Sequence, residues 1–521
     1  WGFMPPYLLS NINRLSSSVD LLAFVDGNAS LYHYDGDGSA NTPDKKLLIF
    51  GQRRGGFSYT TLDVTNHSAP LYKYSIDADH LGSGQEVLGQ SWAEPQPCRM
   101  GYMDNSTYKT KDVFFLSGGY DINQDKEGEE KATEDSIGRA VFAIDAQTGA
   151  LFSNCLFSHS NYASMTHSII DAAAYPSPYT GTSTRIYAGD LNGNLFAFRD
   201  DIFHRNRDAS KSADFEGKYD GQEDGNWEQK LKLYSAPGKK IWYAPEITYE
   251  YYPVNFTYPA NETGGSSEEI RTEYRVGDFV FFGTGDRSRP NETGTVNVFY
   301  AIKNNWQWPD NSPTIIEAYV DKNDNGTVKA KSDNHIITDE EYFILDVTDN
   351  RIHDQQVDEQ VRIDFNNFVK TALKKPNNRG WFLRLIEKNG SSVGEKLVSS
   401  PLIFSGIVLF TTFVPESNAD GSCDAGNDPC ASPGSSGTGY LYALDYLTGA
   451  DAFNLVEERR LPLAKSGIPP APTLIVTEEG PIVLVGTQGP SDDDEDDDID
   501  PWPDLKKNVV ERFFWRQLNL N

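Results

Sequence analysis

The feature that most constrains how this chain can fold is a strand ending that recurs along it. The clearest copies are Val141-Phe-Ala-Ile-Asp145-Ala-Gln-Thr-Gly149, Tyr440-Leu-Tyr-Ala-Leu-Asp445-Tyr-Leu-Thr-Gly449 and the looser Tyr59-Thr-Thr-Leu-Asp63-Val-Thr-Asn66. In each copy a run of β-forming residues stops at an aspartate and then turns. The carboxylate can accept hydrogen bonds from backbone N–H groups of the turn, and glycine supplies the positive φ that the reversal needs. Each copy therefore predicts a strand that ends in a tight turn.

Weaker copies of the same unit lie among these three. They are Ile186–Phe198, Val298–Ile302 and Tyr342–Asp349, and the first contains Asn192-Gly193, a strong signal for a hairpin turn. A single copy would be an ordinary hairpin end, but six copies are typical of a radial repeat of small sheets. The sequence therefore predicts a β-propeller, in which one blade connects to the next at these turns.

Composition supports a large all-β fold. The chain has 521 residues, with 27 Tyr, 28 Phe and 9 Trp, and strand-favouring residues outnumber strong helix formers in most stretches. A blade needs roughly 40 to 50 residues, so seven blades would leave room for long insertions. We expect a single domain over 1–521, a modified propeller of seven blades with long loop insertions and a few short helices, among them 365–375 and 506–515. An acidic insertion at 490–504 is interpreted as a solvated segment.

Charge excludes nucleic acid as a partner, and hydropathy predicts that this chain has no membrane-spanning segment. Lys and Arg number 46 and Asp and Glu 76, and the net charge of −30 repels the phosphate backbone of a nucleic acid. No run of about 20 apolar residues exists, so we expect no transmembrane segment in this chain. The chain starts at Trp1 without a signal peptide, and we interpret it as a fragment of a longer protein.

The four cysteines indicate an oxidising compartment. Cys423 and Cys430 lie in the insertion 415–439, which is rich in Gly, Ser and Pro and has no His. That spacing favours a local disulfide over a metal site. Cys98 and Cys155 could form a second bridge.

A series of short motifs resembles the C-terminal domain of the PilC/PilY family, the large type IV pilus biogenesis factors and tip adhesins. The motifs follow the family's order, and they are Phe24–Gly27, Gly55–Asn66, Gly89–Pro95, Ser117–Asp121, Tyr187–Phe198, Tyr243–Glu246, Phe282–Gly285, Gly380-Trp381, Gly394–Pro401, Phe410–Pro415 and Trp515–Leu518. Each motif is short, but their order is specific, and together they extend from about residue 24 to residue 518.

The resemblance implies a modified β-propeller at the tip of a type IV pilus, on the cell surface. It implies that such a protein binds minor pilins, promotes pilus assembly, counters retraction and supports adhesion to host cells or abiotic surfaces. We therefore expect function by binding rather than by catalysis. None of these roles follows from composition.

Calcium is the cation that the resemblance implies, and this chain departs from the family at the expected position. The family carries a loop of the form Asp-x-Asp/Asn-x-Asp-Gly-x-x-Asp before its Tyr-Ala-Gly-Asp strand, and calcium there is tied to control of retraction. In this chain residues 174–184 stand at that place and contain no carboxylate. Calcium binds about six to eight oxygens, most of them charged. A loop of Pro, Tyr, Ser and Thr does not supply them.

Other loops carry the alternating oxygen ligands of a calcium site. One has the glycine of an EF-hand loop at its sixth position, and its candidate ligands are Asp321, Asn323, Asn325, Thr327 and Asp333. A second, without the glycine, offers Asp121, Asn123 and Asp125. A third and weaker candidate is the segment 35–39. For each loop the alternative, which the residues favour, is a turn whose side chains cap backbone N–H groups without a metal.

Two other functions remain open from the sequence. Quinoprotein dehydrogenases share the blade endings, but their adjacent-cysteine disulfide is missing, and the sequence has neither a Gly-x-Ser-x-Gly nor a His-Glu-x-x-His motif. A purely structural or glycan-binding extracellular propeller is the second alternative. Bound quinone would be visible as absorbance, which would separate the redox enzyme from the other two.

Overall fold

The computed structural model describes most of the chain. The described residues are 2–9, 24–34, 44–82, 87–105, 107–177, 180–200, 227, 229–258, 269–304, 314–350, 358–387, 389–416, 437–452, 459–477 and 480–485. They form two compact units: unit 1 holds those up to Ala244, and unit 2 those from Pro245 onward. Whether the two units act as the one domain expected for 1–521 stays a prediction.

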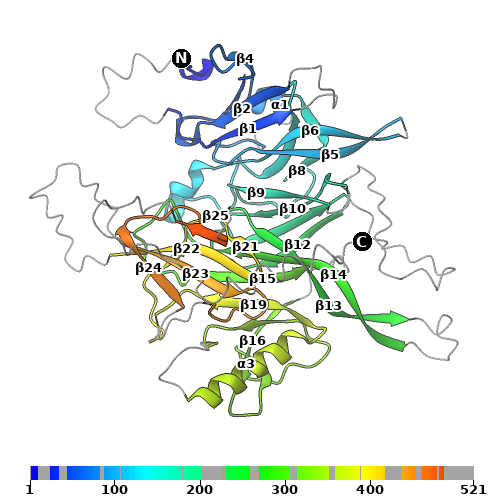
Figure 1. Ribbon diagram of the computed structural model, residues 1–521, viewed down its shortest axis with the longest axis vertical. Coiled ribbons are helices and arrows are strands. Elements are labelled where there is room, and N and C mark those ends of the chain that lie inside the picture. The colour runs from blue at the N-terminus through cyan, green and yellow to red at the C-terminus, as the bar shows by residue number, and fades with distance from the viewer. Residues whose placement is uncertain are drawn as a thin grey trace, which may run out of the picture. The chain divides into compact units, whose positions relative to one another are not determined.

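Unit 1 is built from three antiparallel meanders of four strands each (Figure 1). The first contains β1 (Ala29–Tyr34), β2 (Lys45–Gly51), β3 (Tyr59–Asp63) and β4 (Leu71–Ile76), followed by the short helix α1 (Ala78–Leu81). The second contains β5 (Gln96–Asp104), β6 (Thr107–Ser117), β7 (Ala140–Asp145) and β8 (Leu151–Ser158). The third contains β9 (Ala172–Pro176), β10 (Ser183–Gly189), β11 (Asn194–Arg199) and β12 (Gln229–Ser235). A parallel pairing of Ser183 with Met100 joins the last two into one sheet.

Unit 2 repeats this construction with one insertion. Its first meander is β13 (Glu246–Tyr258), β14 (Glu269–Gly283), β15 (Val298–Asn304) and β19 (Asn378–Arg384). Between β15 and β19 come β16 (Ile316–Asp321), β17 (Thr327–Ala330), β18 (Phe343–Asp346) and the helix α3 (Glu359–Leu373). A further sheet contains β20 (Lys396–Leu397), β21 (Leu402–Phe404), β22 (Ile407–Pro415), β23 (Gly437–Asp445) and β24 (Arg460–Ser466), and a hairpin of β25 (Thr473–Thr477) and β26 (Gly480–Leu484) follows.

The inner strands are buried on both faces, which explains the apolar runs at their centres. All residues of β10, β11 and β15 are buried. Successive meanders of unit 1 share a core. One cluster joins the first two meanders through Ile49, Tyr59, Phe114, Phe142 and Ile144. Unit 1 therefore has the face-to-face packing of neighbouring blades.

The strand endings form the turns that the sequence predicts. Asp145 Oδ1 accepts hydrogen bonds from the N–H groups of Gln147 and Thr148, at 2.8 and 3.0 Å. Asp445 Oδ1 likewise accepts from the N–H group of Thr448 at 2.8 Å. The glycines that follow have φ angles of 76° and 66°. The aspartate and the glycine therefore play their expected parts.

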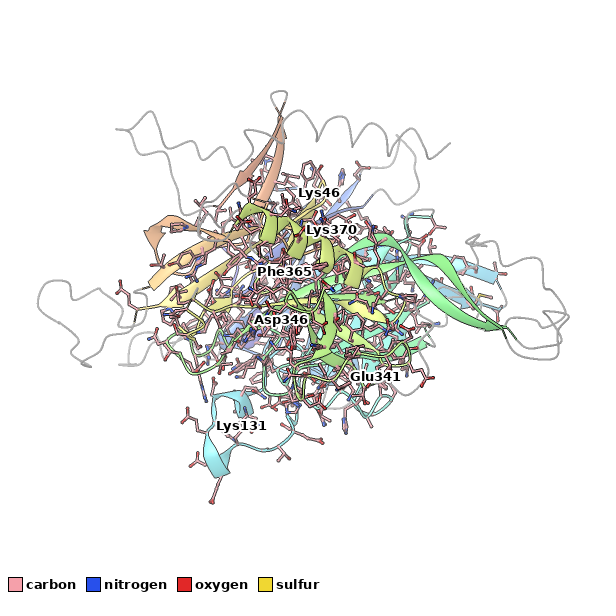
Figure 2. The ribbon with its side chains drawn as sticks, turned by 90° about the horizontal axis from the view of Figure 1, so that it is seen from below. Lys46, Lys131, Glu341, Asp346, Phe365 and Lys370 are labelled. Carbon is pink, nitrogen blue, oxygen red and sulfur yellow. The ribbon has the colours of Figure 1, made fainter. Side chains whose placement is uncertain are left out.

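The fold class is all-β, as predicted, and the short helices differ in extent from the expectation. The helix expected at 365–375 is α3, which begins at Glu359 because the Asp358 carboxylate caps the N–H groups of Gln360 and Val361. Figure 2 shows Phe365 and Lys370 along this helix. The expected helix 506–515 and the insertion 490–504 lie outside the described residues. No helix among the described residues has the length and apolar character that crossing a membrane requires.

The number of seven blades stays a prediction. Over the described ranges, three meanders in unit 1, the first meander of unit 2 and the sheet around β22 have the form of blades. The hairpin β25–β26 supplies two strands more.

Candidate functional site

Four of the motifs come together in unit 1, where they form one aromatic cluster. The motif cluster consists of Trp92, Tyr120, Ile170, Leu191, Trp242 and Tyr243. Its three central rings lie 5.6 to 5.9 Å apart between centroids. The residues come from loops at the ends of different strands. The motifs that look independent in the sequence therefore build a single site.

Backbone hydrogen bonds between the loops hold the motif cluster in place. Gln90 and Tyr120 exchange N–H to oxygen bonds of 2.9 and 3.0 Å, and Leu191 N–H donates to Ser168 O at 3.0 Å. Gly119 has a φ of 88°, and a Cβ there would lie 2.0 Å from Gln90 O. Only glycine allows this close approach of two backbones. The glycines of the Gly-Gly-Tyr-Asp motif are thus explained by packing.

Two arginines cover the half-buried ring of Trp92. The guanidinium carbons of Arg53 and Arg54 lie 5.4 and 5.9 Å from the ring centroid, within cation–π range. Arg54 also pairs with Asp125 at 3.3 Å, and Asp125 accepts a 2.7 Å hydrogen bond from the Tyr120 hydroxyl. Arg53 has a φ of 47°, which is uncommon for a residue with a side chain. The two guanidinium groups and the half-buried Trp92 ring thus lie together on one surface of unit 1.

A carboxyl group with a shifted pKa lies next to this surface. Burial, together with the nearby Glu94 carboxylate, raises the pKa of Asp171 to about 7. Its Oδ1 accepts a hydrogen bond from Ala172 N–H at 3.0 Å. Glu94 in turn accepts from the Asn28 side chain at 2.8 Å. The named residues offer contact and charge rather than a nucleophile with an adjacent base, and the arrangement suits binding.

The first predicted calcium loop forms the turn between β16 and β17. Lys329 Nζ lies 2.9 Å from Asp321 Oδ2 and 2.9 Å from Asp324 Oδ2. Asp321 Oδ1 accepts the N–H group of Asn323 at 2.9 Å, and Thr327 Oγ1 donates to Asp324 O at 2.6 Å. Both carboxylate oxygens of the predicted ligand Asp321 are thus bound by donors of the chain, and the Thr327 hydroxyl donates within the turn.

Two further predicted ligands of that loop have other roles: Asp333 forms an ion pair, and Asn325 is part of the turn. Asp333 pairs with His335 at 2.6 Å. Asn325 adopts a φ of 50°, next to Gly326 at 79°. A Cβ at Gly326 would lie 2.5 Å from the ring of Phe368, which belongs to α3. The glycine that resembled an EF-hand signal therefore accommodates a packed helix.

The second predicted loop is a hydrogen-bonded network in unit 1. Asp121 Oδ2 accepts from Ser136 N–H, the Ser136 hydroxyl and Ile137 N–H, at 2.7, 3.0 and 3.1 Å, and Oδ1 accepts from Asn123 N–H at 2.8 Å. Although burial opposes ionisation, these hydrogen bonds hold the pKa of Asp121 below its usual value. Asn123 Nδ2 donates to Asp135 Oδ1 at 2.8 Å.

Asp135 extends this network, whereas the third predicted ligand of the loop lies outside it. The two oxygens of Asp135 accept from Gln124 Nε2 at 2.9 and 3.0 Å. Lys131, labelled in Figure 2, donates to the Gln124 side-chain oxygen at 3.3 Å. The ligand candidate Asp125 belongs instead to the pair with Arg54. Within the described residues, no group of three or more His, Cys, Asp and Glu is arranged to hold a metal.

The predicted disulfides stay predictions. Cys98 and Cys155 belong to one core cluster of unit 1, and both are free thiols in the structure. Burial raises the pKa of Cys98 to about 12 and that of Cys155 well above its ordinary value. Cys423, Cys430 and the loop 35–39 lie outside the described residues.

Comparisons with known proteins agree with the resemblance found in the sequence. No family model matches the chain. PilY1 of Pseudomonas aeruginosa, a type IV pilus biogenesis factor, is 22% identical over 500 residues, which are 90% of this chain and 34% of that protein. A PilY1 homolog of Xylella fastidiosa is 22% identical over 458 residues, 84% of this chain and 24% of that protein. The chain thus spans about a third or less of the length of these curated relatives.

A solved structure extends the likeness to the fold. The crystal structure of the C-terminal domain of Pseudomonas aeruginosa PilY1 matches with a TM-score of 0.53 at 17% sequence identity, over 94% of this chain and 88% of that one. The chain is therefore an all-β protein with a modified β-propeller fold. Its predicted resemblance to the C-terminal β-propeller domain of the PilC/PilY family is confirmed.

Proposed function

We propose that this chain is the C-terminal propeller of a type IV pilus biogenesis factor and that it acts by binding. Its partners are the minor pilins at the pilus tip, and binding promotes pilus assembly and counters retraction. The same protein supports adhesion to host cells or other surfaces, from a position outside the cell. Calcium modulation of this activity is a separate question, which depends on the loops at Asp321 and Asp121.

The observation that carries the proposal is the extent of the likeness to PilY1. Similarity covers 90% of this chain, and the fold match covers 94% of it. The solved chain that it matches is itself a C-terminal domain. A match of this extent supports a shared role more strongly than a few shared motifs would.

The candidate binding surface is the part of the motif cluster that reaches solvent: the half-buried Trp92 ring with Arg53 and Arg54 over it. Tyr120, Ile170, Leu191 and Trp242 are buried beneath it and support it. Trp, Tyr and Arg are the residues most enriched among those that dominate binding energy at protein interfaces. Here Trp92, Arg53 and Arg54 stand together, and the side chain of Arg54 is 45% exposed. The backbone bonds between the loops hold these groups rigidly, which lowers the entropic cost of binding.

Genetics in the producing organism tests the proposed role. Deletion of the gene segment that encodes this chain should abolish surface pili. A second deletion that inactivates retraction should restore some of them, because assembly then proceeds without opposition. Unchanged piliation in the first strain would contradict the proposal.

A further inference from the structure

The Asp321 loop has the sequence of a cation site, and the structure places a cation of the chain inside it. The ammonium of Lys329 lies 2.9 Å from one carboxylate oxygen of Asp321 and 2.9 Å from one of Asp324. The Lys329 side chain is only 18% exposed, so it is folded onto the turn rather than extended into water. An ammonium is a compact charge with three donors. It can therefore neutralise two carboxylates at once.

The hairpin geometry fixes the lysine in this position. Asp321 pairs with Thr327 across the two strands, and Lys329 lies two residues further along β17. Side chains two residues apart in a strand point to the same face. The lysine is thus directed toward the aspartates by the register of the sheet. Phe368 packs against the turn at Gly326.

The oxygens of the loop are therefore a poor fit to calcium. Calcium needs about six to eight oxygen ligands around one centre. Asp321 has one oxygen on Lys329 and the other on Asn323 N–H, while Asp333 is paired with His335. Binding would require the release of a bound ammonium and the loss of hydrogen bonds that shape the turn.

The Asp121 loop leads to the same conclusion by a different route. Both oxygens of the Asp121 carboxylate are used, by three backbone N–H groups and one hydroxyl. Asp121 is 2% exposed. Here backbone donors supply the positive partial charge that a metal would otherwise provide.

We infer that Lys329 is the built-in cation of the Asp321 loop and that both loops hold their shape without calcium. The contacts made by these residues therefore do not fit the calcium binding that the family resemblance implies. Replacement of the lysine should expose the latent ligands. The inference does not depend on the pilus role.

Thermal melting of the 521-residue chain with about 1 mM calcium or with a chelator tests this inference. Four proteins are compared: wild type, Lys329→Gln, Asp321→Asn and the Lys329→Gln/Asp321→Asn double variant. A ligand that binds only the folded state stabilises it by RT ln(1 + [L]/Kd) and thereby raises the melting temperature. Asp321 ends β16 and Lys329 lies in β17, and both side chains are partly exposed, so folding of the variants is expected.

The expected result is specific to the lysine. Lys329→Gln should gain a calcium-dependent rise of about 1–5 °C, since extracellular calcium modules have Kd values of about 0.1 to 1 mM. The double variant should lose that gain. Asp321→Asn should respond to calcium as wild type does, even if a site elsewhere in the chain binds the ion. A wild-type response that disappears in Asp321→Asn, or the absence of any gain in Lys329→Gln, would overturn the inference.

Discussion

The phenol of Tyr74 donates a 2.9 Å hydrogen bond to the main-chain oxygen of Ala146. Ala146 follows Asp145, so an aromatic side chain of the first meander is bonded to the closing turn of the second. Unit 2 contains an equivalent contact, in which Trp381 Nε1 donates to the oxygen of Tyr446 at 3.1 Å. Tyr446 likewise follows the aspartate of its turn. The repeated strand ending is thus also a repeated junction between meanders.

In each turn the glycine lies against the aromatic ring that makes the hydrogen bond to that turn. A Cβ at Gly149 would stand 2.6 Å from the ring of Tyr74. A Cβ at Gly449 would stand 3.1 Å from the ring of Trp381. Glycine is therefore required twice, for its positive φ and for the space that the ring fills.

Loss of the Tyr74 hydroxyl should weaken this junction measurably. Tyr74 is 8% exposed, so Tyr74→Phe leaves the Ala146 oxygen buried without its donor. We expect unit 1 to lose about 1–2 kcal/mol of stability in urea unfolding. The matched control is Tyr72→Phe, because Tyr72 is 50% exposed. Equal stability of the two variants would show that the hydrogen bond does not stabilise the junction.

A comparison of two glycines separates strain from crowding. Gly149→Ala meets both a φ of 76° and the Tyr74 ring, whereas Gly238→Ala meets a φ of 77° with nothing within 4 Å of the new Cβ. Strain alone costs about 1–2 kcal/mol. Gly149→Ala should cost about 1–3 kcal/mol more, as overpacking does. Calorimetry of both variants gives the two losses of stability. Identical losses would show that crowding against the Tyr74 ring adds nothing to the backbone strain.

A buried ion pair in unit 2 should be sensitive to the loss of one partner. Glu395 is fully buried and accepts hydrogen bonds from Arg460, Thr412 Oγ1 and the Tyr442 hydroxyl. Arg460→Met should cost about 3–5 kcal/mol in chemical denaturation, because a buried carboxylate remains without its cation. The double variant Glu395→Gln/Arg460→Met should recover part of the loss.

An exposed pair provides the control for this experiment. Lys109 lies 2.6 Å from Asp104, and half of its side chain is exposed. Lys109→Met should leave the melting temperature unchanged. A loss as large as that of Arg460→Met would contradict the role of burial.

The stability of unit 1 should fall as pH rises toward neutrality. The pKa of Asp171 is raised by burial from 3.8 to about 7 in the folded chain. The folded state therefore retains a proton that the unfolded state has lost, and the stabilisation present below about pH 4 disappears as pH rises through 7. Asp171→Asn cannot ionise, so its melting temperature relative to wild type should increase between pH 4 and 7 and then level off.

The size of this effect follows from the shift in pKa. A shift of about three units corresponds to a difference of about 4 kcal/mol between the two ends of the range. Melting curves of both proteins at several pH values give the comparison. Parallel profiles would exclude Asp171 as the titrating group.

Local features were predictable from sequence, and features that depend on tertiary contacts were not. The turn at Asp145 follows from residues at most four positions apart, so its pattern is visible in the sequence. The bond between Asn123 and Asp135 spans 12 positions and depends on how the loop folds back. Lys329 would have been identifiable only with the register of the hairpin in hand. The start of α3 at Glu359 was missed although Asp358 is an ordinary N-cap signal.

The motif cluster illustrates the same limit at larger scale. Trp92 and Trp242 are 150 positions apart in sequence, yet their rings lie 5.8 Å apart. Order along the chain identified the motifs but did not indicate that they meet. The meeting depends on the packing of three meanders in unit 1.

Binding to purified minor pilins of the producing organism tests the central claim most directly. By interferometry, the 521-residue chain should bind with a Kd of about 1 µM or tighter. Arg54→Glu should weaken binding at least tenfold, while Lys109→Glu, which makes the same change of charge away from the motif cluster, should not. Absence of any binding by the wild-type chain would contradict the account.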